Sequence, residues 1–511
     1  MQSVSAYFTT ASGATYRRPV PKLEVQWNGT DWVDETAYLL SFVLTQTVQR
    51  PGVDVASAEE LIAKGSVTLR NVSYRFSPWH SGGDDTIRTY LTTGWGPTGK
   101  AVRLSMGFWC DTDSDGDYDE VQYCRIMTGY LYEPKETPAQ STVSYSMRDR
   151  GWLLYQSRAV TAPYQDYRLD ALLSAYATAG GWPDALTADT SAWTIPYAWL
   201  DDDPVLREMQ LAAHSVQGRL WIDANGAIRY EESSHWLGHS SVWTFDAGDL
   251  VDLPPKLLIE DFASSVVVEY NPRQKVAPDV VFSLDEAKTI RPSSSETFIW
   301  RLDQPALTVT TPEEGIDYWL DSGAGAPMNS SCTVAATAYA QQVSVTITNN
   351  HASLAAVLRF FQLRGVPIVG GRTEQATDVI DASPDVPRVR SLRGDFYMQT
   401  FAQAEAMAAM LGDRQGSVQP VFTVRSVPGV PQLELGDKVT YSDSRAVSVA
   451  RTGYVLSINH RFTMPAGGQS SEAAEPAYAQ DIEILDAAAL FPAGTYFVIG
   501  TTALGSGVCW Y

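Results

Sequence analysis

Alternation of apolar and polar residues with a period of two is the feature that most restricts how this chain can fold. In the first part of the sequence it occupies five segments: Leu23 to Trp27, Ser66 to Phe76, Ala101 to Trp109, Tyr123 to Tyr132 and Ser141 to Met147. Such alternation is typical of antiparallel strands that cover a core with one face only. The sequence therefore predicts an antiparallel β-domain over residues 1–158.

The pattern changes in residues 159–255. Helical spacing appears from Tyr167 to Ala179 and again from Pro204 to Gln217, where the run Asp201 to Asp203 before the proline predicts a capped helix start. Asn225-Gly226 then lies between two apolar runs, which is a strong hairpin signal. We expect an α+β module here, in which helices and a hairpin pack as one unit.

Strand signals return after Leu253-Pro254-Pro255. We expect a β-sandwich over residues 256–388 and a last domain over residues 389–511. The sandwich signals are Ser264 to Tyr270, Glu296 to Leu302 and Gln341 to Thr348; the last domain shows a helix from Thr400 to Leu411 that Gly412 would end, strands Val421 to Val427, Asp437 to Tyr441, Gly453 to Phe462 and Ala479 to Leu485, and an apolar tail from Leu490 to Tyr511. The predicted fold class is mainly β with an α+β middle module, in several sandwich- or barrel-like domains.

Composition narrows the function classes. With 511 residues the chain exceeds one hydrophobic core, and 44% hydrophobic against 19% charged residues is the balance of a folded protein. A net charge of -22 argues against specific nucleic-acid binding, which depends on Lys and Arg, but suits a wall past which DNA slides. The sequence has no apolar run of about 18 residues and no signal-peptide core in Met1 to Arg18, so we expect neither a membrane span nor secretion.

The sharpest local motif is a run of alternating aspartates. Asp111, Asp113, Asp115, Asp117 and Asp119 surround Gly116, a spacing similar to that of an EF-hand calcium loop. A hard divalent cation would relieve the repulsion between these carboxylates. Gln122 stands where a bidentate glutamate is usual, and strands rather than helices flank the run. Calcium binding by these five aspartates and a solvated acidic hairpin tip therefore both remain open.

Other motifs are weaker. Gly94 to Lys100 fits the start of a phosphate-binding loop, but Ala101 replaces the hydroxyl residue and a strand follows, so a glycine-rich turn is expected. His235 and His239 have metal-pair spacing in a segment that favours a loop.

The remaining histidines, His80, His214, His351 and His460, are scattered, and the sequence shows no Ser-His-Asp or Cys-His set, so we expect no enzyme activity. Four cysteines are too few for a disulfide scaffold, although Cys110 and Cys124 bracket one hairpin and could face each other, as a disulfide or as free thiols.

Four stretches, in this order, resemble the baseplate or tail-tip hub proteins of long-tailed bacteriophages, a family related to the central hub of contractile tails and of gene-transfer agents. They are Gly65 to Pro78 with Gly99 to Leu104, Arg125 to Leu131 with Val143 to Arg150, the helix and hairpin Val205 to Tyr230, and Leu433 to Val439 with Gly453 to Phe462 and Tyr478 to Leu485. Residues 256–388 carry no such signature.

The resemblance implies a structural virion protein at the tail tip, made in the host cytoplasm. It implies a homotrimeric ring whose tube-like β-domains line the DNA channel, between the tail tube with its distal tail protein and the tip fibre or spike. The alternative is a receptor- or carbohydrate-binding minor tail protein that stacks sugars on exposed aromatics such as Trp79, Trp95, Trp193 and Trp199. A cell-wall hydrolase is a third reading, which needs a cleft with perturbed acids or a zinc site, and the sequence indicates neither.

Overall fold

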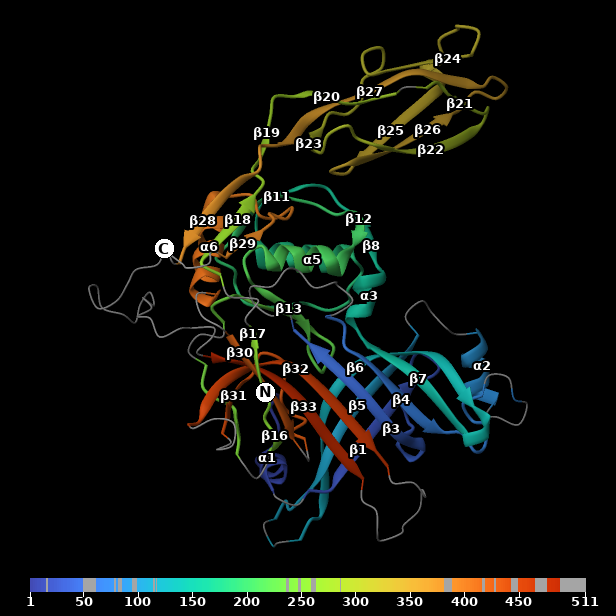
Figure 1. Cartoon of the computed structure of the whole chain (residues 1–511). Coiled ribbons are helices and arrows are strands. Elements are labelled where there is room, and N and C mark those ends of the chain that lie inside the picture. The colour runs from blue at the N-terminus through green and yellow to red at the C-terminus, as the bar shows by residue number, and fades with distance from the viewer. Residues whose placement is uncertain are drawn as a thin grey trace.

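A computed structural model of the chain shows a mainly β protein with a small number of helices (Figure 1). It describes residues 1–14, 17–48, 61–77, 80, 85–93, 99–113, 115, 117–235, 239–246, 250–258, 263–284, 286–380, 388–415, 419–426, 429–442, 449–464 and 476–487. The predicted fold class, mainly β with several sheets and a mixed middle module, is confirmed. The apolar tail from Leu490 and residues 381–387, at the end of the predicted sandwich, lie outside the described residues.

A 14-stranded sheet contains both ends of the described chain. Its first part, the N-terminal β unit, is antiparallel and pairs in the order β3-β4-β7-β6-β5-β1-β2. The bounds are β1 Pro19–Gln26, β2 Val33–Asp34, β3 Leu39–Thr47, β4 Lys64–Arg70, β5 Lys100–Cys110, β6 Glu120–Thr137 and β7 Thr142–Asp149, with helices α1 Ala6–Gly13 and α2 Asp85–Thr93 beside them. The inward residues of these strands, such as Leu23, Leu104 and Tyr145, form one apolar core. The alternation in the sequence reports this one-sided burial.

The expected strand from Ser66 to Phe76 is shorter than predicted. β4 ends at Arg70, and the Asn71 carboxamide oxygen accepts a hydrogen bond from the Phe76 N–H at 3.0 Å while Tyr74 adopts a φ of 57°. An asparagine that binds its own local backbone favours a turn over a strand. Alternation continues through this turn and does not reveal where the strand stops.

The second part of the sheet, the C-terminal β unit, is built mainly from the end of the described chain. Its strands are β30 Gln419–Ser426, β31 Lys438–Tyr441, β32 Arg451–Thr463 and β33 Ala477–Asp486, joined by β15 Trp243–Phe245, β16 Leu250–Asp252 and β17 Pro255–Leu258 from the middle of the sequence. Residues such as Val439, Ile458 and Ile482 form a second apolar core. Each β unit therefore has its own interior.

Strands β3 and β32 join the two units. They pair antiparallel from Ser41↔Thr463 to Thr47↔Ser457, and Phe42 stacks on Phe462 with ring centres 5.5 Å apart. Residues 1–158 and 389–511, expected as separate domains, thus share one continuous sheet. Periodicity identifies a strand but not its partner, and these partners are some 400 residues apart.

The middle module packs helices against short sheets, between the two β units and the upper part of Figure 1. Its helices are α3 Gly151–Gln156, α4 Leu169–Ala179 and α5 Val205–His214, and its strands are β8 Arg158–Val160, β9 Tyr164–Arg168, β10 Thr187–Ala188, β11 Thr194–Ala198, β12 Asp201–Pro204, β13 Arg219–Ile222 and β14 Ile228–Glu231. The predicted β13–β14 hairpin is present. Its turn is closed by the Asp223 N–H on the Ala227 oxygen at 2.9 Å, with Gly226 at a φ of +83°.

The predicted aspartate cap of α5 is wrong. Pro204 occupies the N-cap position and no side chain caps the helix, because Asp201 belongs to β12, which pairs with β8. Asp201 is instead 2.8 Å from the Arg301 guanidinium. The three aspartates therefore precede the helix without capping it. They belong to strand β12, and Asp201 forms an ion pair.

Residues 256–388, expected as one sandwich, divide between the C-terminal β unit and two further cores. A sandwich projects from the rest of the molecule in Figure 1. It comprises β19 Arg273–Lys275, β20 Asp279–Ser283, β21 Lys288–Ile290, β22 Ser294–Arg301, β23 Ala306–Val309, β24 Tyr318–Asp321, β25 Cys332–Ala338, β26 Gln342–Asn349 and β27 Ala356–Gly370. A smaller core below it combines β18 Ser265–Tyr270, β28 Glu374–Val379 and β29 Val389–Leu392 with helix α6, Phe401–Gln415.

Helix α6 is longer than its predicted end at Gly412. This glycine lies inside the helix, where an added Cβ would collide with the carboxylate of Asp378 on β28. Gly412 thus allows close helix-to-strand packing and does not serve as a C-cap. Among the described residues, no helix combines the length and the apolar character that a bilayer crossing needs.

Candidate functional site

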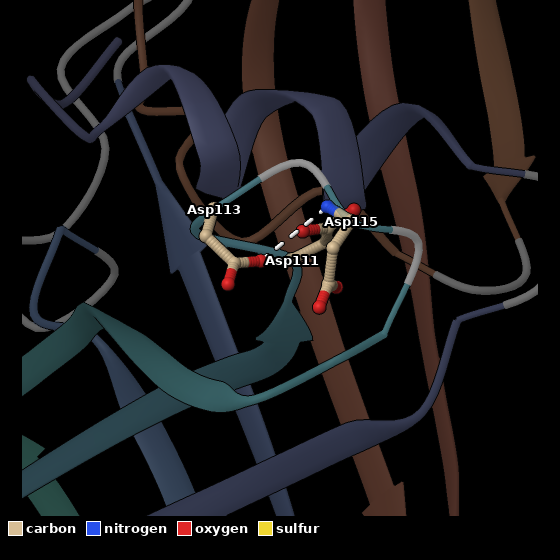
Figure 2. A group of neighbouring side chains, drawn as sticks. All are labelled: Asp111, Asp113 and Asp115. Carbon is tan, nitrogen blue, oxygen red and sulfur yellow. Dashed lines mark hydrogen bonds between the residues drawn. The ribbon is translucent and has the colours of Figure 1, made fainter.

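The aspartate run forms the tip of the hairpin between β5 and β6 (Figure 2). Carboxylate oxygens of Asp111, Asp113 and Asp115 all lie within 4.8 Å of one another, which is close enough for one cation. Asp119 is turned elsewhere: its carboxylate accepts hydrogen bonds from the Thr112 hydroxyl at 2.9 and 3.0 Å, and these lower its pKa. Asp117 uses its N–H to bind the Asp115 carboxylate at 2.9 Å. We call the five aspartates the acidic tip.

The predicted loop therefore gathers three of its five carboxylates. Strands flank it, as the sequence indicates, so the helices of an EF-hand are replaced by a hairpin. Asp113, Asp115, Asp117 and Asp119 are exposed. Calcium binding at this tip stays a prediction, with Asp111, Asp113 and Asp115 as its ligand set.

The possible pairing of Cys110 with Cys124 is wrong. In the β5–β6 register Cys110 lies opposite Glu120 and Cys124 opposite Met106, so the two thiols are in different rungs of the ladder. Both are buried and free, and burial raises the pKa of Cys124 to about 12. They are core residues with little thiolate at neutral pH. Cys332 is also free and Cys509 lies outside the described residues.

His235 and His239 lie close together, and His460 lies in a separate environment. His235 lies 2.8 Å from Asp189, and its ring centre is 4.7 Å from that of His239. His460 is fully buried between the Tyr478 hydroxyl and Gln46, and burial lowers its pKa to about 3. It is held neutral by the core. Among the described residues, the acidic tip is the one group of three or more acidic, histidine or cysteine side chains near enough to share a metal ion.

The glycine-rich segment before β5 falls mostly outside the described residues, but its end is visible. Lys100 begins a strand and is itself buried, which lowers its pKa. No helix N-terminus follows to present N–H groups to a phosphate.

The aromatic residues that the sequence suggests for sugar stacking are not suited to it. Trp199 is buried and packs edge-on against Phe396, and Trp193 is partly buried against the core of the middle module. Trp79 and Trp95 lie outside the described residues. An exposed aromatic pair occurs elsewhere, on the outlying sandwich, where Trp319 on β24 and Phe360 on β27 are register partners with 39% and 41% exposure.

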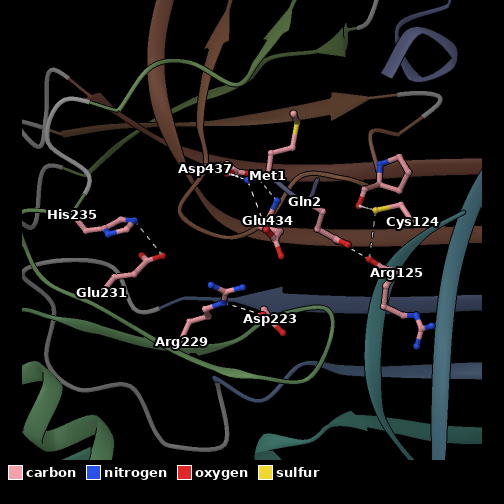
Figure 3. A network of polar contacts seen from close by, with 11 residues as sticks. Met1, Gln2, Cys124, Arg125, Asp223, Arg229, Glu231, His235, Glu434 and Asp437 are labelled. Atoms are coloured by element: carbon pink, nitrogen blue, oxygen red, sulfur yellow. Dashed lines mark hydrogen bonds and ion pairs between the residues drawn. The ribbon is translucent and has the colours of Figure 1, made fainter. Parts of the chain in front are cut away.

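A polar network lies where the N-terminal segment, the β13–β14 hairpin and the C-terminal β unit meet (Figure 3). The Met1 amino group forms an ion pair with Asp437 and lies 3.7 Å from Glu434. Burial raises the pKa of Glu434 to about 7. The Gln2 N–H donates to the Gln432 oxygen at 2.9 Å, and the Gln2 side-chain amide donates to the Arg125 oxygen at 2.6 Å. The first two residues are thus fixed beside residues 432–437 and beside β6.

Next to this network is a hollow of about 560 Å³ that sequence reasoning misses. Its walls include Gln26, Trp32, Arg103, Arg125, Thr128 and Arg150. The Arg103 guanidinium lies 4.0 Å from the centre of the Trp32 ring. Burial and the nearby Arg103 lower the pKa of Arg125. We call this site the arginine hollow, defined by Arg103, Arg125, Arg150 and Trp32.

A β-bulge brings the arginines together. Arg103 pairs with Thr128 and Ser105 pairs with Arg125, so Ile126 is an extra residue on β6. Without it, strict alternation would direct Arg125 to the face opposite Thr128, whereas the bulge puts both on the face of Arg103. Arg125 then donates from Nε to the Ser105 hydroxyl at 3.0 Å. The only trace in the sequence is Ile126-Met127, two adjacent apolar residues inside an alternating strand.

Comparison with known proteins gives matches in structure alone. No family model matches the sequence, and no curated protein matches it significantly. Among the solved structures that are similar over nearly the whole chain are three tail proteins. The tail protein from Neisseria meningitidis has 8% identity, covers 93% of this chain and 98% of its own, and gives a TM-score of 0.49.

A prophage tail protein from Shewanella oneidensis has 11% identity, 91% and 98% coverage and a TM-score of 0.46. A prophage tail protein from Listeria monocytogenes has 8% identity, 91% and 94% coverage and a TM-score of 0.43. These likenesses are of fold alone. At such identities no residue's role passes from these proteins to this chain.

Proposed function

We propose that the chain is a structural hub at the tail tip of a bacteriophage-like particle, where three copies form a ring that links the tail tube to the tip fibre or spike. The observation that carries this proposal is the pair of β units with separate cores on one continuous sheet. A ring of three such chains presents six β units. It would therefore match a sixfold tube on one side and a threefold fibre or spike on the other.

A channel role for DNA is consistent with the charge of the chain. At -22, the protein repels a polyanion over about one Debye length, roughly 8 Å at physiological salt. DNA would pass through such a ring without being held. The proposal therefore places the protein in the virion, next to the distal tail protein and the tail tube, in a structural and not a catalytic role.

Mass measurement in solution together with negative-stain images tests the proposal. We expect a species of three times the mass of one chain. The images should show a ring with threefold symmetry in which six β units surround the axis. A chain that is monomeric at all concentrations, or rings without threefold symmetry, would rule the hub out.

A second candidate function is saccharide binding by the outlying sandwich. Trp319 and Phe360 lie beside each other on its outer surface, and the ion pair between Arg359 and Asp321, at 3.0 Å, supplies polar groups nearby. Exposed aromatic faces with adjacent hydrogen-bonding groups suit sugar rings. A glycan array probed with the full chain and with Trp319→Ala tests this. Equal signals from both proteins would show that these aromatic residues do not bind saccharides.

A further inference from the structure

We propose that the arginine hollow receives the acidic tip of a second copy of this chain. The inference rests on the ring proposed above and names the contact that would close it. The ligand class is a peptide segment with several carboxylates.

The hollow is positively charged on an otherwise acidic molecule. Arg103 has no hydrogen bond or ion pair within the described residues and is held by stacking on Trp32. Arg125 has one weak acidic neighbour, Glu24, at 3.8 Å. Arg150 is bound 2.7 Å from Asp184, which is itself more than half exposed. The guanidinium groups thus outnumber the carboxylates that face them.

The hollow is also preorganised, so binding would cost little side-chain entropy. The bulge at Ile126 and the bond to Ser105 fix Arg125. The Arg150 guanidinium donates to the Gly226 oxygen at 3.3 Å, and the Thr128 hydroxyl donates to the Ala224 oxygen at 3.0 Å. The hairpin turn of β13–β14 therefore forms a rigid wall. Planar guanidinium groups held in this way suit bidentate recognition of carboxylates.

The acidic tip has the complementary properties. Asp113, Asp115 and Asp117 are exposed, and none of them has a cationic partner among the described residues. The tip cannot reach the hollow of its own chain, because at about 3.3 Å per residue of strand Asp111 is roughly 26 Å from Arg103 along β5. The two sites lie at opposite ends of one hairpin and can meet only between copies.

A peptide carboxylate fits the hollow better than nucleic acid does. Nucleic-acid affinity needs an extended set of basic residues, whereas the hollow offers three guanidinium groups. Three guanidinium groups gathered in one open hollow instead match a short loop.

Each chain carries one donor tip and one acceptor hollow at different places. Such a head-to-tail contact generates a ring when the rotation between copies closes. The contact therefore accounts for assembly without requiring a self-complementary surface.

Charge reversal tests the contact in the full chain, with assembly measured by sedimentation velocity. Arg103→Glu, and separately Asp113→Lys with Asp115→Lys, should each weaken assembly on the order of a hundredfold. A chain that carries all three substitutions should assemble again. Arg372→Glu and Glu314→Lys, exposed residues of the same charges away from both sites, are matched controls that should assemble like the wild type.

The outcomes separate the two proposals. If Arg103→Glu assembles as well as the wild type, the hollow is not an assembly site, while the hub stands. If only the arginine variant is impaired and the triple variant is not rescued, the hollow binds something other than the tip, and the inference fails. A wild-type chain that never assembles overturns both. Circular dichroism of each variant confirms that the fold is retained.

Discussion

The carboxylate of Asp149 accepts a hydrogen bond from the backbone N–H of Ala63 at 2.6 Å, at the point where β7 ends and the middle module begins. It also accepts one from the Gly151 N–H at 2.8 Å. The group is fully buried, and burial outweighs these bonds and raises its pKa to about 7.

Folding therefore favours protonated Asp149, and this sets the sign of a pH dependence. The stabilisation is complete below about pH 4, the ordinary range of an aspartate, and is lost as the pH rises through 7. An asparagine replaces one of the two acceptor oxygens by an NH2 group, so Asp149→Asn should be less stable than the wild type at pH 5. From pH 5 to pH 8 the wild type should lose stability, on the order of 1.4 kcal/mol per pKa unit, while the variant, which has no carboxyl to titrate, should not. Melting temperatures across this range measure it. Parallel profiles for the two proteins would contradict it, and Asp31→Asn, at an exposed site, is the control.

Calcium binding by the acidic tip is the second prediction. Binding to the folded form alone would stabilise the protein by about 2.7 kcal/mol at a calcium concentration 100 times the dissociation constant. Titration calorimetry should show one site that Asp113→Asn with Asp115→Asn abolishes. Asp119→Asn is the control within the same loop, because that carboxylate is bound to Thr112. If no heat of binding is measured and neither calcium nor a chelator changes the melting curve, the tip does not bind calcium and is a solvated hairpin tip.

Calcium and the arginine hollow would compete for the same carboxylates. If both predictions hold, added calcium lowers the charge of the tip and weakens ring assembly, while a chelator restores it. Magnesium at equal concentration controls for ionic strength.

The turn of the β13–β14 hairpin gives a prediction about packing. Gly226 has a φ of +83°, and an added Cβ would lie 2.5 Å from the Arg150 Cδ. Gly226→Ala should therefore cost more than Gly181→Ala, because Gly181 has a similar φ of +79° but open space around it. The control should lose about 1 kcal/mol. Equal losses in chemical denaturation would mean that the hairpin does not press on the N-terminal β unit.

The junction of the two β units predicts a large loss from one ring. Phe42 is 1% exposed and stacks on Phe462 across β3 and β32, so Phe42→Ala should destabilise the protein by about 3–5 kcal/mol. Val43→Ala is the matched control, since Val43 follows Phe42 on the strand, points the other way and is 42% exposed. If both variants have the same melting temperature, the contact between Phe42 and Phe462 does not stabilise the junction of the two β units.

Local signals account for the parts of the structure that the sequence predicts well. The alternation from Ala101 to Trp109 becomes β5, and Asn225-Gly226 becomes a turn, because one-sided burial and the φ of a glycine are encoded within a few residues. The aspartates are found at a hairpin tip for the same reason. Asp119 does not join the other carboxylates because the Thr112 hydroxyl binds it.

Long-range features could not be predicted in this way. β3 pairs with β32, but many other strands show the same alternation, so the pattern alone does not identify β32 as the partner. The arginine hollow needs three separate events: the register of β5 with β6, the bulge at Ile126, and the approach of the β13–β14 turn. Each of them depends on contacts between distant segments, so Arg103, Arg125 and Arg150 appear in the sequence as ordinary surface residues.

The pairing of β3 with β32 also sets an order of events during synthesis. β3 pairs with β4 early, but its other edge waits for a strand made about 400 residues later, roughly 20 to 80 seconds at the usual rates of translation. Through that interval a nascent chain carries an open edge of backbone N–H and C=O groups, which is a template for aggregation. High expression should therefore be limited by the growing chain and not by the finished one, and slower initiation or lower temperature should raise the soluble yield.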